Sequence, residues 1–280
     1  MRFQHARLVL IAFFIVVELV SVITTVAHGV VDGTKDTLKT NHSTGALVIQ
    51  LFDSQILVCT ATVITPRVLI TAAHCVDSLS GQPLKFTLGV DAMGARELSS
   101  SVAARRAYVN PAFDLHANGL LHDIALVELE FPLENPTSER LLNPVDAVAM
   151  LHPGTRVEIV GYGRIHADGE LLGTKNYAQA TIASVSADEI VIGAPGDPQN
   201  CDGDSGGPAF IVESNGQKRL IGIVSRSAND ATDCLDGSIH TRVDAYADWI
   251  SSILRKIDEK HQYSKKEREL DARVVSFSVQ

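Results

Sequence analysis

Three short segments of the sequence hold the residue types that nucleophilic acyl transfer requires. His74 lies in Thr-Ala-Ala-His-Cys, Asp123 in His-Asp-Ile-Ala-Leu and Ser205 in Cys-Asp-Gly-Asp-Ser-Gly-Gly-Pro. A serine hydroxyl is an effective nucleophile only when a base removes its proton during attack, and histidine suits that task near neutral pH. A carboxylate behind the histidine holds the ring in the required tautomer. We therefore predict Ser205 as nucleophile, His74 as general base and acid, and Asp123 as the residue that orients His74.

Each segment has a simpler interpretation when it is taken alone: a polar residue after a strand, an aspartate that begins a strand, and a glycine-rich turn. The occurrence of all three segments in one chain argues against coincidence, because the third segment alone matches a pattern of six or more consecutive residues. The stretch from Gly203 to Gly207 also satisfies the G-x-S-x-G pattern of α/β-hydrolases. Those enzymes place the acid and the histidine after the serine, whereas only His240 and His261 follow Ser205 here. The order therefore opposes an α/β-hydrolase.

From about Val30 to about Arg255 the chain resembles the chymotrypsin/trypsin-like serine endopeptidases, most specifically in the segment Gly203–Pro208. The resemblance implies an all-β fold, with two antiparallel six-stranded Greek-key barrels, the active site in the cleft between them, and a C-terminal helix. The base and the carboxylate would come from the first barrel and the nucleophile from the second.

Further roles follow from the resemblance. The backbone N–H groups of Gly203 and Ser205 are expected to form the oxyanion hole, where one donor is worth about 2.7–4 kcal/mol of barrier. Ser225 matches the serine that supports the buried carboxylate. Asp204 matches the aspartate that pairs with a newly freed terminal ammonium group during activation. The expected new N-terminus is Val30, because the segment Val-Val-Asp-Gly that it begins resembles the Ile-Val-Gly-Gly start of family members, except at the third position.

The four cysteines allow three pairings. The resemblance implies the disulfides Cys59–Cys75, beside the proposed base, and Cys201–Cys234, beside the nucleophile. Structural zinc is the alternative, but no C-x-x-C spacing or paired histidine motif supports it. Residues 89–101 lack the several oxygen ligands that a calcium loop needs. We expect no metal and no cofactor.

Substrate preference in this family depends on the residue six positions before the nucleophile, where an aspartate at the pocket floor pairs with Lys or Arg. Here that residue is Gln199, and a neutral amide would leave a buried substrate cation unpaired at a cost of several kcal/mol. We therefore expect cleavage after uncharged or polar residues rather than after Lys or Arg. The other expected pocket residues are Asn200, Arg226, Ser227 and Ser238. Three nearby carboxylates could restore a negative charge: Asp230, Asp233 and Asp236.

Arg226 has two interpretations. In relatives this position flanks the subsites that bind residues upstream of the cut, so an arginine there could attract acidic substrate side chains. The alternative is a surface charge directed to solvent. Screening by salt would separate the two, since an attraction between exposed charges fades at high ionic strength.

The elements that must position these residues are mainly strands. Ten short β-rich runs are separated by Gly, Pro, Asn and Asp clusters. The runs are Ala46–Leu51, Ile56–Ile64, Arg67–Thr71, Leu84–Val90, Asp123–Leu129, Arg156–Val160, Ala178–Val185, Glu189–Ile192, Pro208–Val212 and Leu220–Val224. Strands without intervening helices favour antiparallel barrels or sandwiches. A polar connection at 131–143 divides them into two halves.

One helix is indicated by apolar residues at helical spacing from Tyr246 to Ile257, and we expect its apolar stripe to pack on the second half. The segment beyond it is mostly charged. The expected domain layout is a signal peptide at 1–29, a protease domain at 30–255 and a charged tail at 258–280. Within the protease domain, the first barrel is expected at about 30–135, the second at about 145–243 and the helix at about 244–257.

The first residues have the layout of a secretory signal peptide, with basic residues before an unbroken apolar run, Leu8–Val17. Ala27-His28-Gly29 supplies small residues at a cleavage site. An uncleaved membrane anchor at Leu8–Val26 is the alternative, although Glu18 lies inside it at a cost of a few kcal/mol. Cleavage after Gly29 would create the terminus at Val30 directly, so signal removal and activation are expected to use the same bond. The alternative is earlier cleavage, near Ser21–Thr25, which leaves a short propeptide for another enzyme to remove.

Composition limits the partners. The chain has 280 residues, 45% of them hydrophobic, and a net charge of 24 − 33 = −9. A chain this apolar can form a sizeable core, and the absence of a basic stripe excludes a nucleic-acid partner. We expect a serine endopeptidase that is secreted, into the extracellular space or a bacterial periplasm, without stable membrane association after signal removal. Its expected partners are protein or peptide substrates and protein protease inhibitors. The alternative is a catalytically silent protein that binds partners through a protease scaffold.

Overall fold

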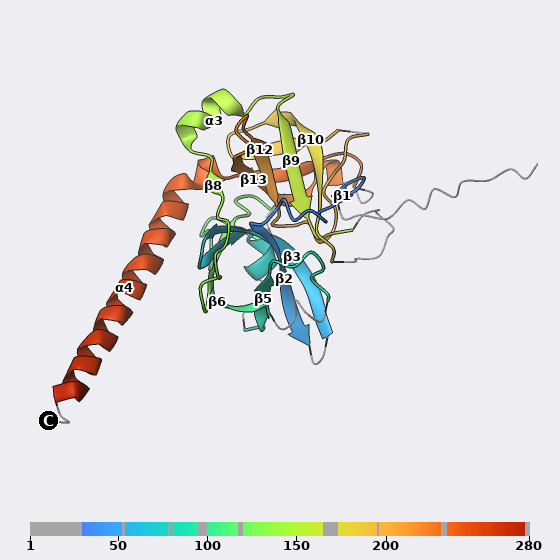
Figure 1. The fold of residues 1–280 in the computed structure, drawn as a ribbon. Coiled ribbons are helices and arrows are strands. Elements are labelled where there is room, and N and C mark those ends of the chain that lie inside the picture. The colour runs from blue at the N-terminus through green and yellow to red at the C-terminus, as the bar shows by residue number, and fades with distance from the viewer. Residues whose placement is uncertain are drawn as a thin grey trace, which may run out of the picture.

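The computed structural model describes residues 30–51, 54–77, 79, 81–94, 100–116, 120–164, 173–194, 196–230 and 234–277. The expected signal peptide, 1–29, lies outside the described residues. Two β-barrels lie next to each other, and a long C-terminal helix extends away from them (Figure 1). None of the helices in the described ranges combines the length and apolar character needed to span a membrane.

Six antiparallel strands close the first barrel in the order β2-β3-β4-β7-β6-β5. Their bounds are β2 (Thr44–Leu51), β3 (Ser54–Thr65), β4 (Val68–Thr71), β5 (Leu84–Thr87), β6 (Val102–Val109) and β7 (Ala125–Leu129). The strands β4 and β7 pair with each other, with Thr71 opposite Ala125. The end of β4 therefore meets the beginning of β7, and this register places the residue that follows β4 next to the residue that precedes β7.

The second barrel also has six antiparallel strands, in the order β10-β11-β14-β13-β12-β9, and pairing of β9 with β10 closes it. Their bounds are β9 (Arg156–Gly161), β10 (Asn176–Val185), β11 (Glu189–Ile192), β12 (Pro208–Val212), β13 (Lys218–Ser227) and β14 (Ser238–Arg242). Two short strands extend this sheet, β1 (Thr34–Lys35) on β10 and β8 (Arg140–Leu141) on β13. The expected fold class, two six-stranded antiparallel barrels, is confirmed.

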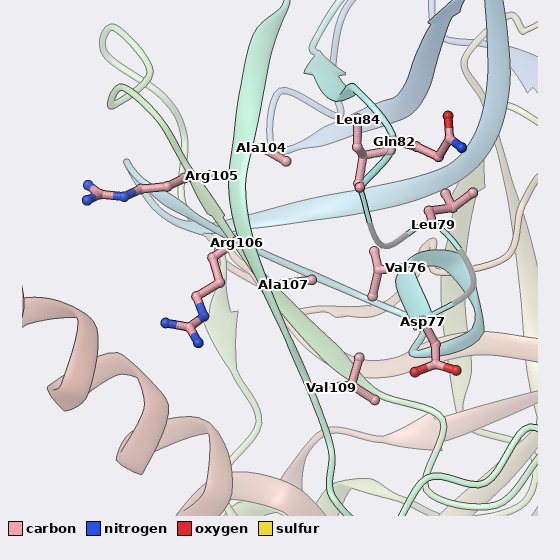
Figure 2. A pocket seen from close by; sticks show the side chains of 11 residues that line it. Val76, Asp77, Leu79, Gln82, Leu84, Ala104, Arg105, Arg106, Ala107 and Val109 are labelled. Atoms are coloured by element: carbon pink, nitrogen blue, oxygen red, sulfur yellow. The ribbon is translucent and has the colours of Figure 1, made fainter.

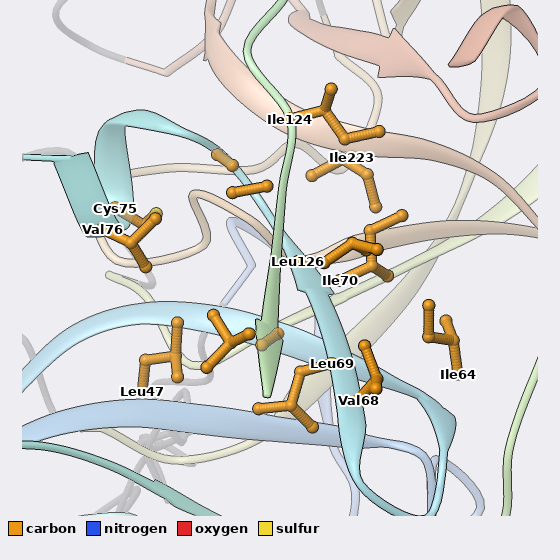
Figure 3. Close-up of a cluster of buried hydrophobic side chains, with 14 of the residues drawn as sticks. Leu47, Ile64, Val68, Leu69, Ile70, Cys75, Val76, Ile124, Leu126 and Ile223 are labelled. Atoms are coloured by element: carbon orange, nitrogen blue, oxygen red, sulfur yellow. The ribbon is translucent and has the colours of Figure 1, made fainter. Parts of the chain in front are cut away.

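The largest hydrophobic cluster crosses from one barrel to the other. It contains Leu69 and Leu126 from the first barrel together with Phe210 and Ile223 from the second. Figure 3 shows Ile223 close to Leu126 and Ile70 at this junction. Burial of such side chains is worth roughly 1.5–3 kcal/mol each, so this cluster holds the two barrels in a fixed relation.

The N-terminal segment belongs to the second barrel, not to the first as the sequence analysis expected. Val30 is fully buried in the second barrel's core cluster, Val31 pairs with Gln199, and β1 pairs with β10. The boundary at residue 30 was wrong because sequence order suggested continuity with β2. The chain crosses to the first barrel only at β2.

The helical elements also differ from expectation. After α1 (His74–Asp77), an unexpected α3 (Pro144–Met150) lies between the barrels in sequence, capped by the Asn143 side chain. The short helices η1 (Ala228–Asp230) and η2 (Asp244–Tyr246) precede α4 (Ala247–Phe277). The expected helix end at 257 was too early, because residues 258–277 contain no Gly or Pro and are rich in strong helix formers.

The long helix α4 packs on the first barrel rather than on the second half. Ile250 and Ile257 are buried in the cluster that the barrels share, and His261 Nε2 lies 2.9 Å from Glu128 Oε1 on β7. Glu128 also accepts a hydrogen bond from the Tyr108 hydroxyl at 3.0 Å. A buried carboxylate on β7 thus has two donors, one of which comes from α4.

Candidate active site

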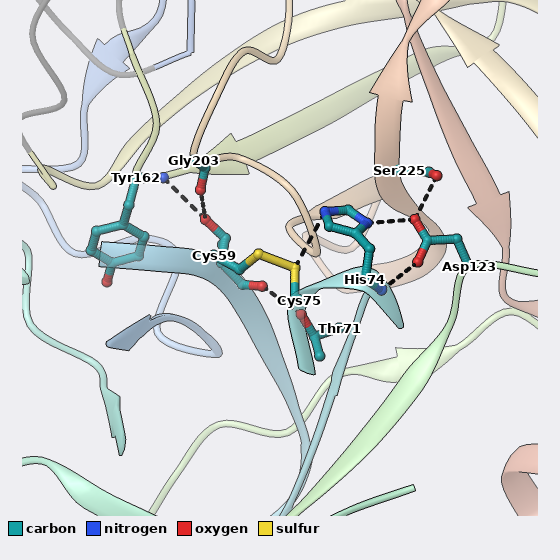
Figure 4. The surroundings of a disulfide bond; sticks show 9 residues. Cys59, Thr71, His74, Cys75, Asp123, Tyr162, Gly203 and Ser225 are labelled. Atoms are coloured by element: carbon teal, nitrogen blue, oxygen red, sulfur yellow. Dashed lines mark hydrogen bonds and ion pairs between the residues drawn. A yellow bond between two sulfur atoms is a disulfide. The ribbon is translucent and has the colours of Figure 1, made fainter. Parts of the chain in front are cut away.

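His74 and Asp123 meet at the edge of the first barrel that the pairing of β4 with β7 creates. His74 begins α1 three residues after β4 ends, and Asp123 lies two residues before β7 begins. The His74 backbone N–H donates to Asp123 Oδ1 at 2.9 Å, and His74 Nδ1 lies 2.7 Å from Asp123 Oδ2. Figure 4 shows both contacts. The carboxylate therefore fixes the imidazole through both its ring and its backbone.

The second barrel completes the surroundings of Asp123. The Ser225 hydroxyl, from β13, donates to Asp123 Oδ2 at 2.6 Å, and the Thr241 hydroxyl donates to the Asp123 backbone carbonyl at 3.0 Å. Asp123 is 0% exposed. A carboxylate that accepts three hydrogen bonds in a buried site is held in a fixed orientation, from which it can stabilise an imidazolium beside it.

Ser205 lies in the loop between β11 and β12, and its backbone contacts β3, the strand whose disulfide leads to the neighbour of His74. Its carbonyl accepts the Thr60 N–H at 2.8 Å, and Thr60 follows Cys59, which is bonded to Cys75 next to His74. Within the described residues the Ser205 hydroxyl makes no hydrogen bond, and His74 Nε2 lies 3.7 Å from Cys75 Sγ. Hydrogen bonds between nucleophile and base are often long without substrate and tighten when it binds.

The expected oxyanion donors are available. Neither the Gly203 N–H nor the Ser205 N–H is hydrogen-bonded to any described residue. Gly203 has φ 93°, a conformation that glycine adopts without strain and that lets this loop turn sharply before Ser205. Two unpaired donors of this kind, next to a nucleophile, can stabilise a tetrahedral oxyanion.

Asp204 is fully buried beneath this loop. Its carboxylate accepts the Gly163 N–H at 2.8 Å and the Cys201 N–H at 2.9 Å, and in the described residues it has no cationic partner. A side chain at Gly161 would clash with it, since a Cβ there would lie 1.9 Å from Asp204 Oδ1. Burial raises the pKa of Asp204 to about 7. In this environment the charged form of the carboxyl group is stabilised when a cation comes into contact with it.

Both expected disulfides are present, Cys59–Cys75 with its Cα atoms 6.0 Å apart and Cys201–Cys234 with them 5.4 Å apart. The first lies beside His74 in Figure 4. Among the described residues, one group of three potential metal-ligating side chains comes together: Cys59, His74 and Cys75. Because the two sulfur atoms are bonded to each other, they are not thiolate ligands for zinc.

Gln199 is fully buried, and its side chain is held by backbone groups. Nε2 donates to the carbonyls of Ala194 at 3.0 Å and Leu235 at 2.5 Å, and Oε1 accepts the Gly237 N–H. Both amide hydrogens are therefore in use, and the amide is neutral. This side chain holds two loops together and has no free donor for a substrate.

The neighbouring polar residues form a small buried network. Ser238 Oγ lies 3.4 Å from Asn200 Oδ1 and 2.9 Å from His240 Nε2. Burial lowers the pKa of His240 to about 3, so this imidazole is neutral. Of the three aspartates considered, Asp236 is exposed, Asp233 lies outside the described residues, and the side chain of Asp230 is likewise not described. Ser227 lies partly buried at the end of β13.

Arg226 is paired within the chain, which opposes its expected attraction of acidic substrates. Nη1 and Nη2 donate to the two carboxylate oxygens of Glu189 at 2.7 and 3.1 Å. Such a two-point pair neutralises the arginine and fixes its plane. The sequence analysis missed Glu189 because it lies 37 residues before Arg226, on β11, which β14 separates from β13.

Sequence reasoning also missed Thr60, which lies inside a strand and carries no motif. Away from the triad, a cavity of about 440 Å³ lies beside α1, between Asp77 and β6. In Figure 2 the guanidinium groups of Arg105 and Arg106 point away from Asp77. Among the described residues that line this cavity there is no serine, cysteine or histidine. It therefore lacks the groups for the chemistry that the triad could perform.

Comparison with known proteins agrees with this geometry. The family model described as Trypsin matches residues 35–250. Transmembrane protease serine 11G of Mus musculus is 31% identical over 213 residues, which cover 69% of this chain and 49% of that protein. Transmembrane protease serine 9 of Rattus norvegicus is 28% identical over 214 residues, covering 71% of this chain and 19% of that protein. The chain thus spans about half or less of the length of these relatives. Since the family model covers well over half of the chain, and the two barrels have the matching fold, this protein belongs to the trypsin family of serine-type endopeptidases.

Proposed function

We propose that the protein is a secreted serine endopeptidase that hydrolyses peptide bonds through an acyl-enzyme on Ser205. The observation that supports this most directly is the Asp123 carboxylate, which contacts His74 twice and accepts the Ser225 hydroxyl in a fully buried site. That arrangement orients an imidazole, and an oriented imidazole is what a serine nucleophile needs.

The mechanism follows from the positions of these groups. As the Ser205 hydroxyl attacks the scissile carbonyl, His74 accepts its proton, and the carbonyl oxygen becomes an oxyanion that the Gly203 and Ser205 N–H groups stabilise. His74 then gives the proton to the leaving amine, and an ester remains on Ser205. Water, deprotonated by His74, attacks the ester, and the acid product leaves with Ser205 restored. Asp123 stabilises the imidazolium in both stages.

Labelling with a fluorophosphonate tests this function. The wild-type chain should be labelled in proportion to its activity on a peptide substrate, and both labelling and activity should disappear in Ser205→Ala. A matched variant, Ser227→Ala, removes a serine outside the triad and should still be labelled. A folded wild-type chain that is neither labelled nor active, after its terminus has been freed at Val30, would instead be a silent binding protein.

The proposed preference is for uncharged or polar residues rather than for Lys or Arg before the cut. The neutral Gln199 amide, with both hydrogens donated to backbone carbonyls, supports it, because nothing in that side chain could balance a substrate cation. Cleavage of a peptide library should therefore show little enrichment of Lys or Arg at this position. A library in which cleavage after Lys or Arg dominates would contradict the proposal.

Activation is proposed to occur when cleavage before Val30 frees an ammonium group that pairs with Asp204. Three observations support it: Val30 is fully buried, Asp204 has no cation in the described residues, and Val30 has φ 60° in the uncut chain. A β-branched residue rarely adopts that φ. Cleavage removes the preceding carbonyl and with it the restriction on φ.

This mechanism predicts a sharp dependence on one residue. A form that starts at Val30 should be active, whereas the same chain with one alanine before Val30 should lose most of its activity. With the substitution Asp204→Asn, both forms should have equally low activity. N-terminal sequencing of the natural, active protein should find Val30, and an active protein with an earlier terminus would overturn the proposal.

Secretion, with protein or peptide substrates and protein protease inhibitors as partners, completes the proposal. Two disulfides suit an oxidising compartment. The named relatives are called transmembrane proteases, so an anchored form is the competing arrangement. Cell fractionation decides between them: recovery of the mature protein in the medium supports secretion, and recovery only in the membrane pellet contradicts it.

A further inference from the structure

The hydroxyl of Thr60 joins the two barrels at the oxyanion loop. Thr60 lies on β3 and is fully buried. Its Oγ1 donates to the Gly203 carbonyl at 3.0 Å and accepts the Tyr162 N–H at 3.2 Å, and both partners belong to the second barrel. The dashed lines that start at the labelled Gly203 and Tyr162 in Figure 4 mark these bonds. We propose that Thr60 is a positioning residue that sets the orientation of the oxyanion hole from the opposite barrel; this rests on the proposed function.

The argument depends on which peptide unit each contact holds. The Gly203 N–H lies in the peptide unit whose carbonyl, from Asp202, accepts the Arg164 N–H at 2.8 Å. The Ser205 N–H lies in the unit whose carbonyl, from Asp204, accepts the Gly207 N–H at 2.8 Å. One unit lies between these two, and its carbonyl is that of Gly203. Thr60 therefore fixes the orientation of the peptide unit that lies between the two oxyanion donors.

The other side of that intermediate unit is also held, since the Asp204 N–H donates to the Cys201 carbonyl at 2.9 Å. Without the hydroxyl, only this bond would fix the unit's rotation. Gly203 has no side chain to resist such a rotation, and its φ of 93° lies where glycine moves freely. Loss of the hydroxyl should therefore let the Gly203 N–H turn away from the oxyanion while substrate contacts remain.

The backbone of Thr60 makes two more bonds that any residue could make. Its N–H donates to the Ser205 carbonyl at 2.8 Å, and its carbonyl accepts the Thr71 hydroxyl at 2.9 Å. Only the hydroxyl depends on the side chain. Thr60→Val keeps the shape and these backbone bonds but removes the bridge to Gly203 and Tyr162, whereas Thr60→Ser keeps the bridge.

A matched control lies two residues away on the same strand. Thr62 is also fully buried, but its hydroxyl has no hydrogen-bond partner among the described residues. Thr62→Val therefore removes the same atom without removing a contact. Each variant, with its terminus freed at Val30, would be measured for kcat and KM on a fluorogenic peptide, with active sites counted by the burst of an active ester. The inhibition constant of phenylboronic acid, whose adduct with Ser205 carries an oxygen in the oxyanion hole, would be measured as well.

Thr60→Val should lower kcat about 10-fold or more, because removal of a whole oxyanion donor costs about 10²–10³-fold and this variant only misplaces one. KM should change less than about twofold, and the phenylboronic acid constant should rise by about the same factor as kcat falls. Thr60→Ser and Thr62→Val should remain within about twofold of wild type.

Several outcomes would overturn the inference: kcat retained in Thr60→Val, equal losses in the two valine variants, or failure of Thr60→Ser to restore kcat. If Thr60→Val does not fold, Thr60→Ala, which also removes the hydroxyl, gives the same comparison and should again lower kcat with little change in KM. Inactivity of the wild type itself would refute the proposed function and is thereby distinguished from failure of this inference.

Discussion

At the scale of single residues, the site depends on carboxylates whose surroundings differ sharply. The Asp123 carboxylate accepts hydrogen bonds from side-chain and backbone donors, including His74. The Asp204 carboxylate accepts backbone N–H groups but has no cation beside it among the described residues. The first arrangement orients an imidazole permanently. The second lacks an opposite charge, so under the proposed function Asp123 serves the chemistry and Asp204 serves activation.

Ser225→Ala should reduce catalysis without removing any triad member. The hydroxyl donates to Asp123 Oδ2 at 2.6 Å, and a hydrogen bond to a charged group is worth about 1.5–3 kcal/mol. We expect kcat/KM to fall about 10- to 100-fold, with fluorophosphonate labelling slowed but still complete. Wild-type kcat/KM in this variant would show that His74 alone suffices to hold Asp123 in place.

Stability of the uncut chain should depend on pH through Asp204. Its pKa is about 7 in the folded chain and near the ordinary 3.8 when unfolded, because burial disfavours the charged form. The folded state therefore binds more protons between these values, and its stability, fully present below pH 4, falls as pH rises to 7. A shift of about three pKa units corresponds to a loss of roughly 4 kcal/mol.

The measurement compares Tm from pH 4 to pH 8 for two inactive forms that retain residues before Val30. One carries Ser205→Ala, and the other carries Ser205→Ala with Asp204→Asn. The first should lose more stability than the second as pH rises, since only the first can ionise at position 204. Parallel curves for the two forms would contradict the assignment.

At the scale of elements, pairing of β4 with β7 explains the meeting of His74 and Asp123 more fully than either motif does. The long helix α4 adds a separate support, since its Ile257 packs into the cluster that both barrels share. The helix contributes no residue to the triad. Its effect on the site should therefore run through the stability of the barrels.

Ile257→Ala should lower stability by about 2–4 kcal/mol, because it removes a buried side chain and leaves a cavity. Catalytic constants at a temperature well below Tm should not change, since within the described part of α4 no hydrogen bond or ion pair reaches the triad. Val145→Ala, on the exposed face of α3, serves as the control and should leave Tm almost unchanged. Denaturant unfolding followed by circular dichroism gives the free energies.

The sequence predicted most strands, the triad order and the two-barrel fold, but it missed four strands: the two-residue β1 and β8, and the longer β6 and β14. β6 has the polar centre Arg105-Arg106, and β14 reads Ser-Ile-His-Thr-Arg, so neither shows an apolar run. In β14 the polar side chains are buried because they bond to one another and to neighbours, as the contact of Ser238 with His240 shows. A hydrophobic pattern cannot reveal a strand whose interior is hydrogen-bonded.

Other misses have a common physical origin in long-range pairing. Sequence spacing could place Gln199 and Arg226 in the pocket region, but it could not show that backbone groups occupy Gln199 or that Glu189 neutralises Arg226. The extension of helix α4 beyond residue 257 was missed for a different reason. Its apolar stripe marks the face that packs, while charged residues with high helix propensity extend the helix without any stripe.

At the scale of the whole molecule, the site is divided between two units that no disulfide joins. Cys59–Cys75 lies within the first barrel and Cys201–Cys234 within the second, and the chain has no other cysteines. Apolar contacts and hydrogen bonds such as those of Thr60 and Ser225 therefore hold the barrels together.

Cleavage of the chain between the two barrels should therefore leave the activity unchanged under native conditions. A recognition sequence for a specific protease, inserted after Asn135, would allow cleavage there. The cut protein should elute as one species and keep its activity, because the shared core remains buried. In denaturant without reductant it should separate into two fragments. Loss of activity on cutting alone would show that the covalent connection is needed to align the barrels.

The placement of the N-terminal segment has a consequence for the order in which the chain can fold. Val31 pairs with Gln199, and Val30 is buried among second-barrel residues that are synthesised far later than Val30 itself. Contacts so distant in sequence close large loops, which makes them slow to form and late on the folding pathway. Residues that are synthesised early in the domain therefore form their contacts with residues that are synthesised late. Even a chain synthesised beyond Ser205 therefore stays inactive, under the proposed activation mechanism, until this N-terminal segment has reached its contacts in the second barrel.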